Sequence, residues 1–262
     1  MYDINNPIVK LSYSDLRDLV ICPMRWELIN VKGVKPDFDL RRFLVPNVID
    51  QAFTDWVNQG FPDNQLLILA LARFDMSIKT NFIRWKHPLD QQEERERTRR
   101  AAWNLEFAMR QRDMCRVGAT SQNRIKLLID TVKLTGRPDI IYHDSLEIYD
   151  VKTTEDKKWL DFGQLHYYAM AISAEKRQRI SKVGFLAPLM DPVVQPCEST
   201  KEDWKNIVTK IKAAEVSVRT KQFPPTGLDN DACYMCLVKR ACPAYNKPVN
   251  AVAKGTRFKV SI

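Results

Sequence analysis

Apolar residues recur at helical spacing over much of the first half of the chain. In residues 43–57 the positions that share one face are Val45, Val48, Ile49, Ala52, Phe53, Trp56 and Val57. This periodicity is typical of an amphipathic helix. Similar spacing predicts further helices over residues 14–20, 24–29, 64–85 and 89–117. We therefore expect the first 117 residues to be mostly helical.

Shorter apolar runs follow, and they have the composition of strands rather than helices. Runs that are rich in Ile, Val, Leu and Tyr predict strands over residues 124–134, 139–142, 146–151 and 182–189. A helix over residues 204–220 is expected to close over the sheet. The pattern thus predicts a protein that combines helices with a sheet.

A turn-forming pair, Asp144-Ser145, separates two of these runs and predicts an antiparallel hairpin. Side chains alternate across a strand, so Asp150 and Lys152 should share one face while Val151 points into the core. Pairing should also bring Asp139 close to Asp150. We expect this face to be open and solvated. Two carboxylates held there would suit Mg²⁺ or Mn²⁺, which prefer oxygen ligands.

These residues predict chemistry on phosphate esters. A metal ion could polarise a phosphoryl oxygen and activate a water molecule, while Lys152 orients that water. Gln164 and Tyr168 are four positions apart in a helical segment, so both could reach a substrate phosphate. His166 should point elsewhere. The prediction is phosphodiester hydrolysis.

Three cysteines near the end of the chain form a C-x2-C-x5-C pattern, and Cys22-Pro23 supplies a fourth thiol. The three are Cys233, Cys236 and Cys242. Four thiolates can hold a [4Fe–4S] cluster or a zinc ion, and the residues by themselves leave both open. Cys197 is a possible substitute ligand, although residues 195–197 are more typical of a strand end, and Cys115 is expected to be an ordinary buried or half-buried thiol.

Composition narrows the class of protein. With 262 residues, 45% of them hydrophobic, the chain can bury a good core. A net charge of +9 favours a polyanionic partner without separating DNA, RNA and membrane. No apolar run reaches the roughly 20 residues that span a bilayer, and the first ten residues lack a signal-peptide pattern. We therefore expect a cytoplasmic protein, in which the six cysteines are metal ligands or buried thiols rather than a disulfide framework.

Three segments with an excess of basic residues have alternative interpretations. Residues 93–100 are expected to form a solvated helix face with internal ion pairs, although their excess of Arg could face a nucleic-acid backbone. Lys157 and Lys158 precede Trp159, which could stack on a base, but a core position is favoured for this Trp. The basic residues 251–262 could be a loose tail or a last strand. No glycine-rich phosphate loop is present, so ATP hydrolysis is not suggested.

Three motifs follow one another in the chain: Gly136-x-x-Asp139, Asp150-x-Lys152 and Gln164-x-x-x-Tyr168. In this order and spacing they resemble the PD-(D/E)XK nuclease superfamily, in its RecB-like branch. The resemblance implies an α/β protein with a restriction-endonuclease-like core, in which helices flank a central mixed sheet. It further implies that Asp139, Asp150 and the Val151 carbonyl bind the metal, that Lys152 serves the attacking water, and that Gln164 and Tyr168 hold DNA.

In that branch the helix that corresponds to residues 43–57 commonly carries a metal-binding His. This chain has Asp50 in the matching pattern, Ile49-Asp50-x-x-Phe53. Asp50 is therefore either a third metal ligand or an exposed helix carboxylate, and both interpretations stay open.

The cysteine pattern is similar to the iron–sulfur subset of RecB-like nucleases, which includes AddB-type subunits and CRISPR-associated adaptation nucleases. This resemblance favours a [4Fe–4S] cluster on Cys22, Cys233, Cys236 and Cys242 over zinc. It also suggests three parts of one integrated unit. These are a helical part at 1–117 with Cys22 and Asp50, a nuclease core at 118–222, and a cluster segment at 223–262.

The resemblance implies a metal-dependent DNA exonuclease that acts on single strands or DNA ends in recombination, repair, or CRISPR or phage DNA processing. Its implied partners are DNA and recombination, helicase or CRISPR adaptation proteins. A non-catalytic DNA-binding adaptor and a structure-specific endonuclease are the alternatives. The intact carboxylates and lysine argue against the adaptor.

Overall fold

A computed structural model of the chain describes residues 8–245 apart from 38, 39, 82, 84, 88, 181, 227–231, 234 and 235. The described residues form two compact units. The larger unit comprises residues 8–14 and 40–212, and the smaller unit comprises residues 15–37 and the described residues from 213 onward. The three-part division at residues 117 and 222 stays a prediction. Residues 251–262 lie outside the described part.

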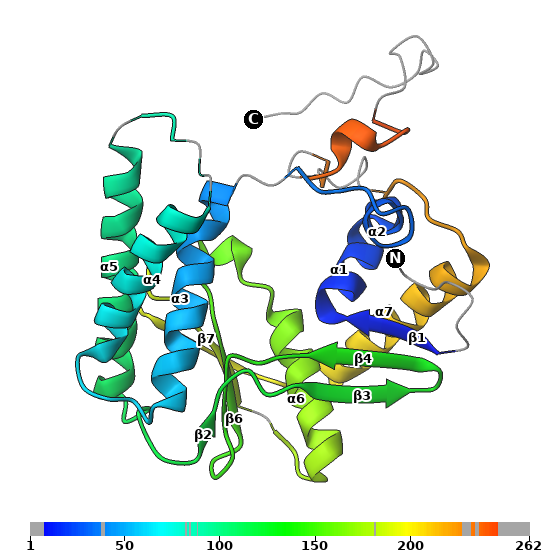
Figure 1. Cartoon of the computed structure of the whole chain (residues 1–262). Helices are drawn as coiled ribbons and strands as arrows, with labels where there is room; N and C mark the ends of the chain where they lie inside the picture. Colours follow the sequence, from blue (N-terminus) through cyan, green and yellow to red (C-terminus); the bar gives the residue numbers. More distant parts are fainter. Residues whose placement is uncertain are drawn as a thin grey trace, which may run out of the picture. The chain divides into compact units, whose positions relative to one another are not determined.

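The elements of the larger unit are shown in Figure 1. In chain order they are β1 (Val9–Ser12), α3 (Leu40–Asn58), α4 (Gln65–Thr80), α5 (Asp90–Gln111), β2 (Ala119–Thr120), β3 (Ile125–Ile129), β4 (Val132–Gly136), β5 (Ile140–Tyr142), β6 (Glu147–Val151), the 3-10 helix η2 (Lys157–Trp159), α6 (Phe162–Lys176), β7 (Lys182–Leu186) and β8 (Val194–Glu198). Two further helices, α1 (Tyr13–Ile21) and α7 (Lys201–Thr220), belong in part to each unit.

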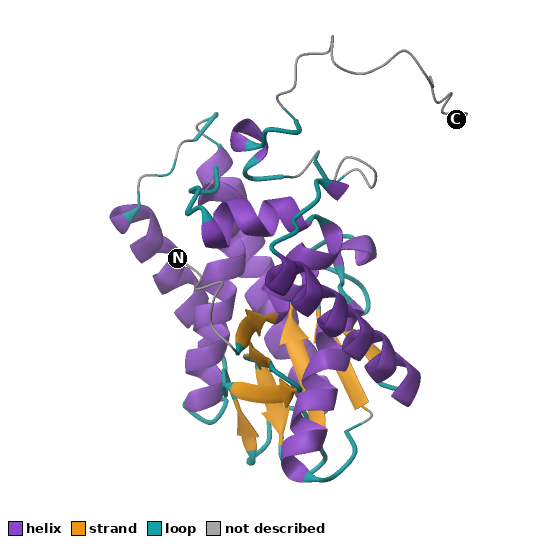
Figure 2. Ribbon diagram, turned by 90° about the vertical axis from the view of Figure 1, so that its right-hand side faces the viewer, coloured by secondary structure: helices purple, strands orange, loops and turns teal. Residues whose placement is uncertain are grey.

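The strands form two mixed sheets. In the three-stranded sheet, β4 lies between β1, which is parallel to it, and β3, which is antiparallel. The five-stranded sheet has the order β2-β5-β6-β7-β8, and only its β6–β7 pair is parallel. The strands gather in one region with helices around them (Figure 2). The predicted α/β class with mixed sheet and flanking helices is confirmed.

The strand predictions needed several corrections: β2 was not predicted, and of β8 only a strand end at residues 195–197 was expected. Residues 124–134, predicted as one strand, form the β3–β4 hairpin, because Asp130 takes a left-handed conformation (φ 50°) and turns the chain back. Strand β1 was not predicted. Its partner is β4, more than a hundred residues later, so its stability comes from pairing that local composition does not reveal. The predicted hairpin of β5 and β6 is confirmed, with Ile141 opposite Ile148.

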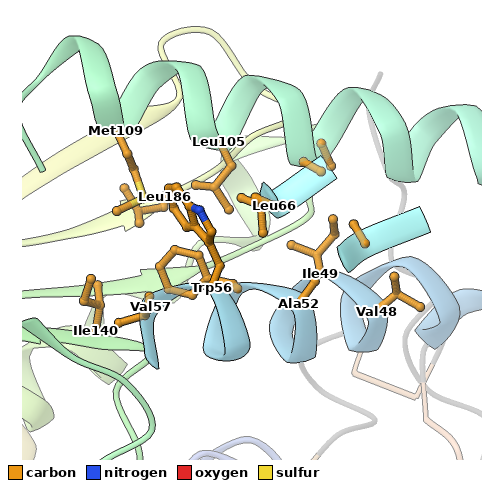
Figure 3. Close-up of a cluster of buried hydrophobic side chains, with 14 of the residues drawn as sticks. Val48, Ile49, Ala52, Trp56, Val57, Leu66, Leu105, Met109, Ile140 and Leu186 are labelled. Carbon is orange, nitrogen blue, oxygen red and sulfur yellow. The ribbon is translucent and has the colours of Figure 1, made fainter. Parts of the chain in front are cut away.

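Helices α3, α4 and α5 pack against one another and cover one face of the five-stranded sheet. Every apolar position that was predicted to face inward in residues 43–57 is buried. Figure 3 shows Trp56 of α3 beside Leu105 of α5 and Leu186 of β7, and Ile49 of α3 near Leu66 of α4. The helices predicted over 64–85 and 89–117 are shorter than expected. For example, α5 ends at Gln111, shortly before the left-handed Asp113 (φ 54°).

Helix α6 contacts the sheet from its other face. Neighbouring strand residues point to opposite sides, so Leu186 joins the helical core while Phe185 meets Phe162 of α6 with ring centroids 5.1 Å apart. Asp150 is in register with Phe185 in the parallel pair of β6 and β7. The Asp150 side chain is thereby directed to the α6 face, where Gln164 is located.

The smaller unit contains residues 15–21 of α1 and 213–220 of α7. Its other described elements are short: α2 (Pro23–Trp26), the π-helix η1 (Glu27–Val31) and the 3-10 helix η4 (Lys239–Ala241). Trp26 is fully buried, and its indole N–H donates to Asp15. Among the helices in the described part of the chain, none is both long and apolar enough to cross a membrane.

Candidate active site and thiol cavity

The larger unit contains a cavity of about 800 Å³ at the end of the β5–β6 hairpin. Its walls come from α3, from the segment before β3, from residues 150–156 and from the start of α6. The residues that matter for its chemistry are Asp50, Gln122, Asp139, Asp150, Lys152 and Gln164. The structure therefore brings the predicted carboxylates and lysine to one space.

Asp139 is held by two donors. Its Oδ1 accepts a hydrogen bond of 2.7 Å from Gln122 Nε2, and its Oδ2 accepts one of 2.6 Å from the Val151 backbone N–H. The same Gln122 amide donates to Asp50 Oδ1 at 3.0 Å. Gln122 thus joins the helix carboxylate to the strand carboxylate. Sequence reasoning missed it, because Gln122 lies in no motif and only the folded chain shows its two partners.

Asp150 is the most deeply buried carboxylate of the cavity, with 2% of its surface exposed. Gln164 Nε2 donates to its Oδ1 at 3.3 Å, and Lys152 forms an ion pair with its Oδ2. This buried Oδ2 has no hydrogen-bond donor in good geometry among the described residues. Lys152 Nζ also lies 5.9 Å from the centre of the Phe185 ring. One carboxylate oxygen is therefore left with capacity for a further ligand.

The expectation of an open, solvated face is wrong for both strand carboxylates. Asp139 and Asp150 are buried at the base of the cavity, because the strands continue into the sheet and α6 covers the face of Asp150. Burial raises the pKa of Asp139 well above its usual range, and the nearby charge of Asp150 raises it further. Burial also raises the pKa of Asp150, against the opposing effect of Lys152. Asp139 and Asp150 would therefore be stabilised by a bound proton or a metal cation.

Asp50 projects from α3 at the exposed rim of the same cavity. Loss of solvation raises its pKa, a hydrogen bond with Asp139 lowers it, and the charge of Asp150 raises it. Its position beside Asp139 is compatible with a third metal ligand. The Gln122 amide donates to both Asp50 and Asp139 and so connects Asp50 to the site. An ordinary surface carboxylate would not need this hydrogen bond.

The donors fit a hard divalent cation in their chemistry. As they stand, the described residues contain no group of three or more His, Cys, Asp or Glu side chains arranged to hold a metal ion. However, burial raises the pKa of both strand carboxylates, and a bound cation beside the Lys152–Asp150 ion pair would offset the cost of burying these charges. The two strand carboxylates are therefore the best candidate ligands.

Gln164 and Tyr168 share one face of α6, as predicted. Gln164 Nε2 donates to the Tyr168 hydroxyl at 2.7 Å, and that hydroxyl donates to the Arg137 carbonyl at 3.3 Å. Tyr168 is buried, so it positions Gln164 more readily than it could contact a substrate. A Cβ at Gly136 would lie 2.6 Å from Tyr168 Cε1, which explains the glycine in the first motif. His166 turns away and shares a hydrogen bond with Ser199.

Two of the three basic segments meet the cavity in different ways. Trp159 was expected in the core but is 56% exposed, because it ends the short η2 turn at the cavity wall. Lys158 Nζ lies 5.4 Å from the centre of its indole ring. The run 93–100 forms the predicted helix face with ion pairs, for example Arg99 with Glu96. Arg97 of this run also lines the cavity and donates to the Thr153 carbonyl.

A second chemical feature belongs to the smaller unit. A small cavity of about 10 Å³ is lined by the thiols of Cys22, Cys233, Cys236 and Cys242. Cys22 and Cys242 are buried, and all four thiols are free. Burial raises the pKa of Cys233, and its three cysteine neighbours raise it further. The structure therefore brings together the four predicted thiols, although the absence of a ready metal-ligand group among the described residues applies here too.

The remaining cysteines lie apart from this cavity. Cys115 is half-buried, as predicted, and burial raises the pKa of its thiol to about 11. Cys197 lies in β8 and donates to the Glu198 carbonyl. Neither is among the residues that line the thiol cavity in the described part of the chain.

Comparison with known proteins agrees with this geometry. A family model, the PD-(D/E)XK nuclease superfamily, matches residues 10–243. The crystal structure of a protein named as a putative exonuclease from Eubacterium rectale is similar, with a TM-score of 0.56, 14% identity, and coverage of 95% of this chain and 93% of that chain. SSO0001 is similar more weakly, with a TM-score of 0.43, 16% identity, and coverage of 91% and 87%. No curated protein matches the sequence.

Proposed function

Because the chain belongs to the PD-(D/E)XK nuclease superfamily, we propose that it is a metal-dependent DNA exonuclease of the RecB-like branch. The observation that supports this most is the buried pair Asp139 and Asp150, with Lys152 on the same cavity. A non-catalytic adaptor would have no need to bury two carboxylates of raised pKa beside a lysine.

Each residue of the cavity has a proposed role. Asp139, Asp150 and the Val151 carbonyl would hold Mg²⁺ or Mn²⁺, with Asp50 as a third side-chain ligand. A bound ion would supply a water molecule of lowered pKa and stabilise negative charge on the phosphate. Lys152 Nζ, already paired with Asp150, would hold and orient the attacking water.

The substrate phosphate would contact Gln164, whose amide lies between Asp150 and the Tyr168 hydroxyl. Tyr168 is a positioning residue in this scheme, because its hydroxyl donates to the Arg137 carbonyl and fixes the Gln164 rotamer. The exposed Trp159 and Phe43 line the same cavity and offer aromatic faces for unpaired bases. This favours a single strand as substrate.

The four thiols of the smaller unit are the proposed ligands of a [4Fe–4S] cluster. Their support is that Cys22 and Cys233, 233 − 22 = 211 positions apart, reach one cavity with Cys236 and Cys242. A zinc ion is the alternative occupant, since four thiolates suit it equally well. We propose a structural role for the occupant. A place in recombination, repair or CRISPR processing in the cytoplasm rests on the resemblance alone.

The proposed activity is tested with end-labelled single-stranded DNA and Mg²⁺ or Mn²⁺. We expect stepwise shortening of the linear strand and survival of a closed circle of the same sequence. Rapid nicking of the circle would instead favour a structure-specific endonuclease. Binding without any cleavage, in protein with its full metal content, would favour the adaptor.

A further inference from the structure

A second cavity of about 360 Å³ lies in the larger unit, at the end of the three-stranded sheet. Strand register brings its walls together, because Ser12 of β1 lies opposite Thr135 of β4, and Ile125 of β3 lies opposite Gly136. Arg124 directly precedes β3 and so reaches the same end of the sheet. Residues that are far apart in sequence thus form one polar hollow.

The charged side chains that line this second cavity are basic. Arg124 and Arg137 both line it, both are exposed, and neither is paired with a carboxylate within the described part of the chain. The described lining contains no Asp or Glu. The hydroxyls of Ser12, Ser14 and Thr135 add possible hydrogen-bond donors. Two guanidinium groups beside hydroxyl donors, without a counter-charge, are suited to an anion.

The floor of the second cavity is rigid. The Tyr13 hydroxyl donates to both oxygens of Asp161 at 2.9 Å, and its ring stacks on Tyr167 of α6 at 5.8 Å. A Cβ at Gly163 would lie 2.5 Å from the Tyr13 hydroxyl, so this ring is tightly enclosed. Arg124 and Arg137 therefore lie beside well-packed side chains, which should keep the shape of the second cavity.

The second cavity adjoins the candidate active site, because two residues line both. Arg137 and Gln164 line both cavities. A strand whose phosphate lies at Asp139 and Asp150 therefore has its next phosphates within reach of the second cavity. The charge matches, since arginine binds phosphate oxygens through two parallel N–H donors.

We propose that this second cavity is a phosphate subsite for the strand that is cut, with Arg124 and Arg137 as its cationic ligands. The proposal rests on DNA being the substrate, as proposed above. The phosphate has two possible sources, a terminal monoester at the strand end or an internal diester of the backbone. Both present the same oxygens to the two arginines.

The test measures binding of a short single-stranded oligonucleotide, fluorescently labelled at an internal base, with Ca²⁺ as the metal so that cleavage is slow. Arg124→Gln is compared with Arg179→Gln, an exposed arginine of the same unit that lies outside both cavities. We expect Arg124→Gln to weaken binding about tenfold and to reduce the slope of log K against log salt by about 0.7, the value for one lost phosphate contact on a single strand. Arg179→Gln should change neither.

Oligonucleotides with a 5′-phosphate, a 3′-phosphate or only hydroxyl ends distinguish the two sources. A preference for one phosphorylated end that disappears in Arg124→Gln identifies the terminal monoester. Equal weakening for all three identifies the internal diester. Arg124→Lys keeps the charge and should retain the salt slope, and equal melting temperatures of the three variants exclude misfolding.

If the wild-type protein binds DNA and Arg124→Gln binds it as tightly as Arg179→Gln does, the phosphate subsite is refuted. The proposed nuclease function would not be affected by that result. A wild-type protein that neither binds nor cleaves any of the three oligonucleotides instead contradicts the proposed function. The two failures are therefore distinguishable in one set of titrations.

Discussion

The carboxylate cavity and the thiol cavity differ in what supports them. Around the carboxylates, three helices and a five-stranded sheet bury a large apolar core that includes Phe53, Trp56 and Leu105. Around the thiols, the buried cluster of described residues is small, with Leu28, Val238 and Cys242 as its members. We therefore expect the framework of the first site to fold without a bound metal.

The difference suggests that the fold supports the carboxylate site, whereas the thiol site supports the fold around it. A small apolar cluster contributes little stability, so the segments next to the thiols should depend on a bound metal to stay in place. Cys242 is itself part of the cluster, and its thiol contacts Met24 Sδ at 3.6 Å. We therefore expect a ligand on the thiols to hold the smaller unit together, whereas a metal on the carboxylates should serve chemistry.

The largest effect is expected at the carboxylates, in activity. Asp150→Asn should lower the cleavage rate of end-labelled single-stranded DNA by about 10³-fold or more, because a neutral amide cannot hold the divalent ion. The apo protein should keep its melting temperature, since the amide matches the shape of the buried carboxylate. Asp144→Asn, at the exposed β5–β6 turn, is the matched control and should cleave normally.

Lys152→Ala should abolish cleavage similarly but should also destabilise the fold. Asp150 is buried, and removal of its ion-pair partner leaves a buried carboxylate uncompensated. Thermal unfolding of Lys152→Ala beside Asp150→Asn measures this difference. Full activity in either variant would refute the site.

The second effect is expected at the thiols, in stability. Anaerobically purified wild-type protein should contain about four irons per chain and absorb broadly in the visible range. Cys233→Ser and Cys236→Ser should lose iron, melting temperature and solubility together, because the cluster links segments that few apolar contacts hold. Iron and zinc content by elemental analysis, with thermal melting, measures this.

Cys115→Ser is the matched control, since Cys115 is a half-buried thiol of the larger unit. Similar iron content in all three variants would refute the ligand assignment, and zinc without iron would identify the alternative occupant. An unchanged melting temperature after loss of the metal would show that the thiol site does not stabilise the fold.

A smaller effect is expected for Asp50→Asn, which should lower the cleavage rate about tenfold at limiting Mg²⁺. Asp50 shares Gln122 with Asp139, so a third ligand at this position would raise metal affinity without being essential. A titration of rate against Mg²⁺ concentration should show a higher half-saturating concentration. An unchanged titration would make Asp50 an ordinary helix carboxylate.

The smallest effect is expected for Trp159→Ala, about five- to tenfold weaker binding of single-stranded DNA, the loss of one stacked base. Trp103→Ala is the control, because Trp103 is similarly exposed on α5 but does not line the carboxylate cavity. Fluorescence titration with Ca²⁺ measures both. Equal losses in the two variants would remove Trp159 from the substrate path.

Local patterns in the sequence determined the helical face of residues 43–57, the β5–β6 hairpin and the shared face of Gln164 and Tyr168. Each of these depends on residues within a few positions of one another, where the 3.6- and 2-residue periods operate. The order of the three motifs likewise indicated the superfamily before any contact was known.

Only the tertiary structure decided the features that depend on distant partners. These include the β1–β4 pairing, the Gln122 bridge, the burial of Asp150 and the exposure of Trp159. Strand pairing and burial arise from contacts between residues that are far apart in the chain, which a local period does not encode. The sequence therefore determined which groups carry the chemistry, and the fold decided how deeply they are buried and which partners hold them.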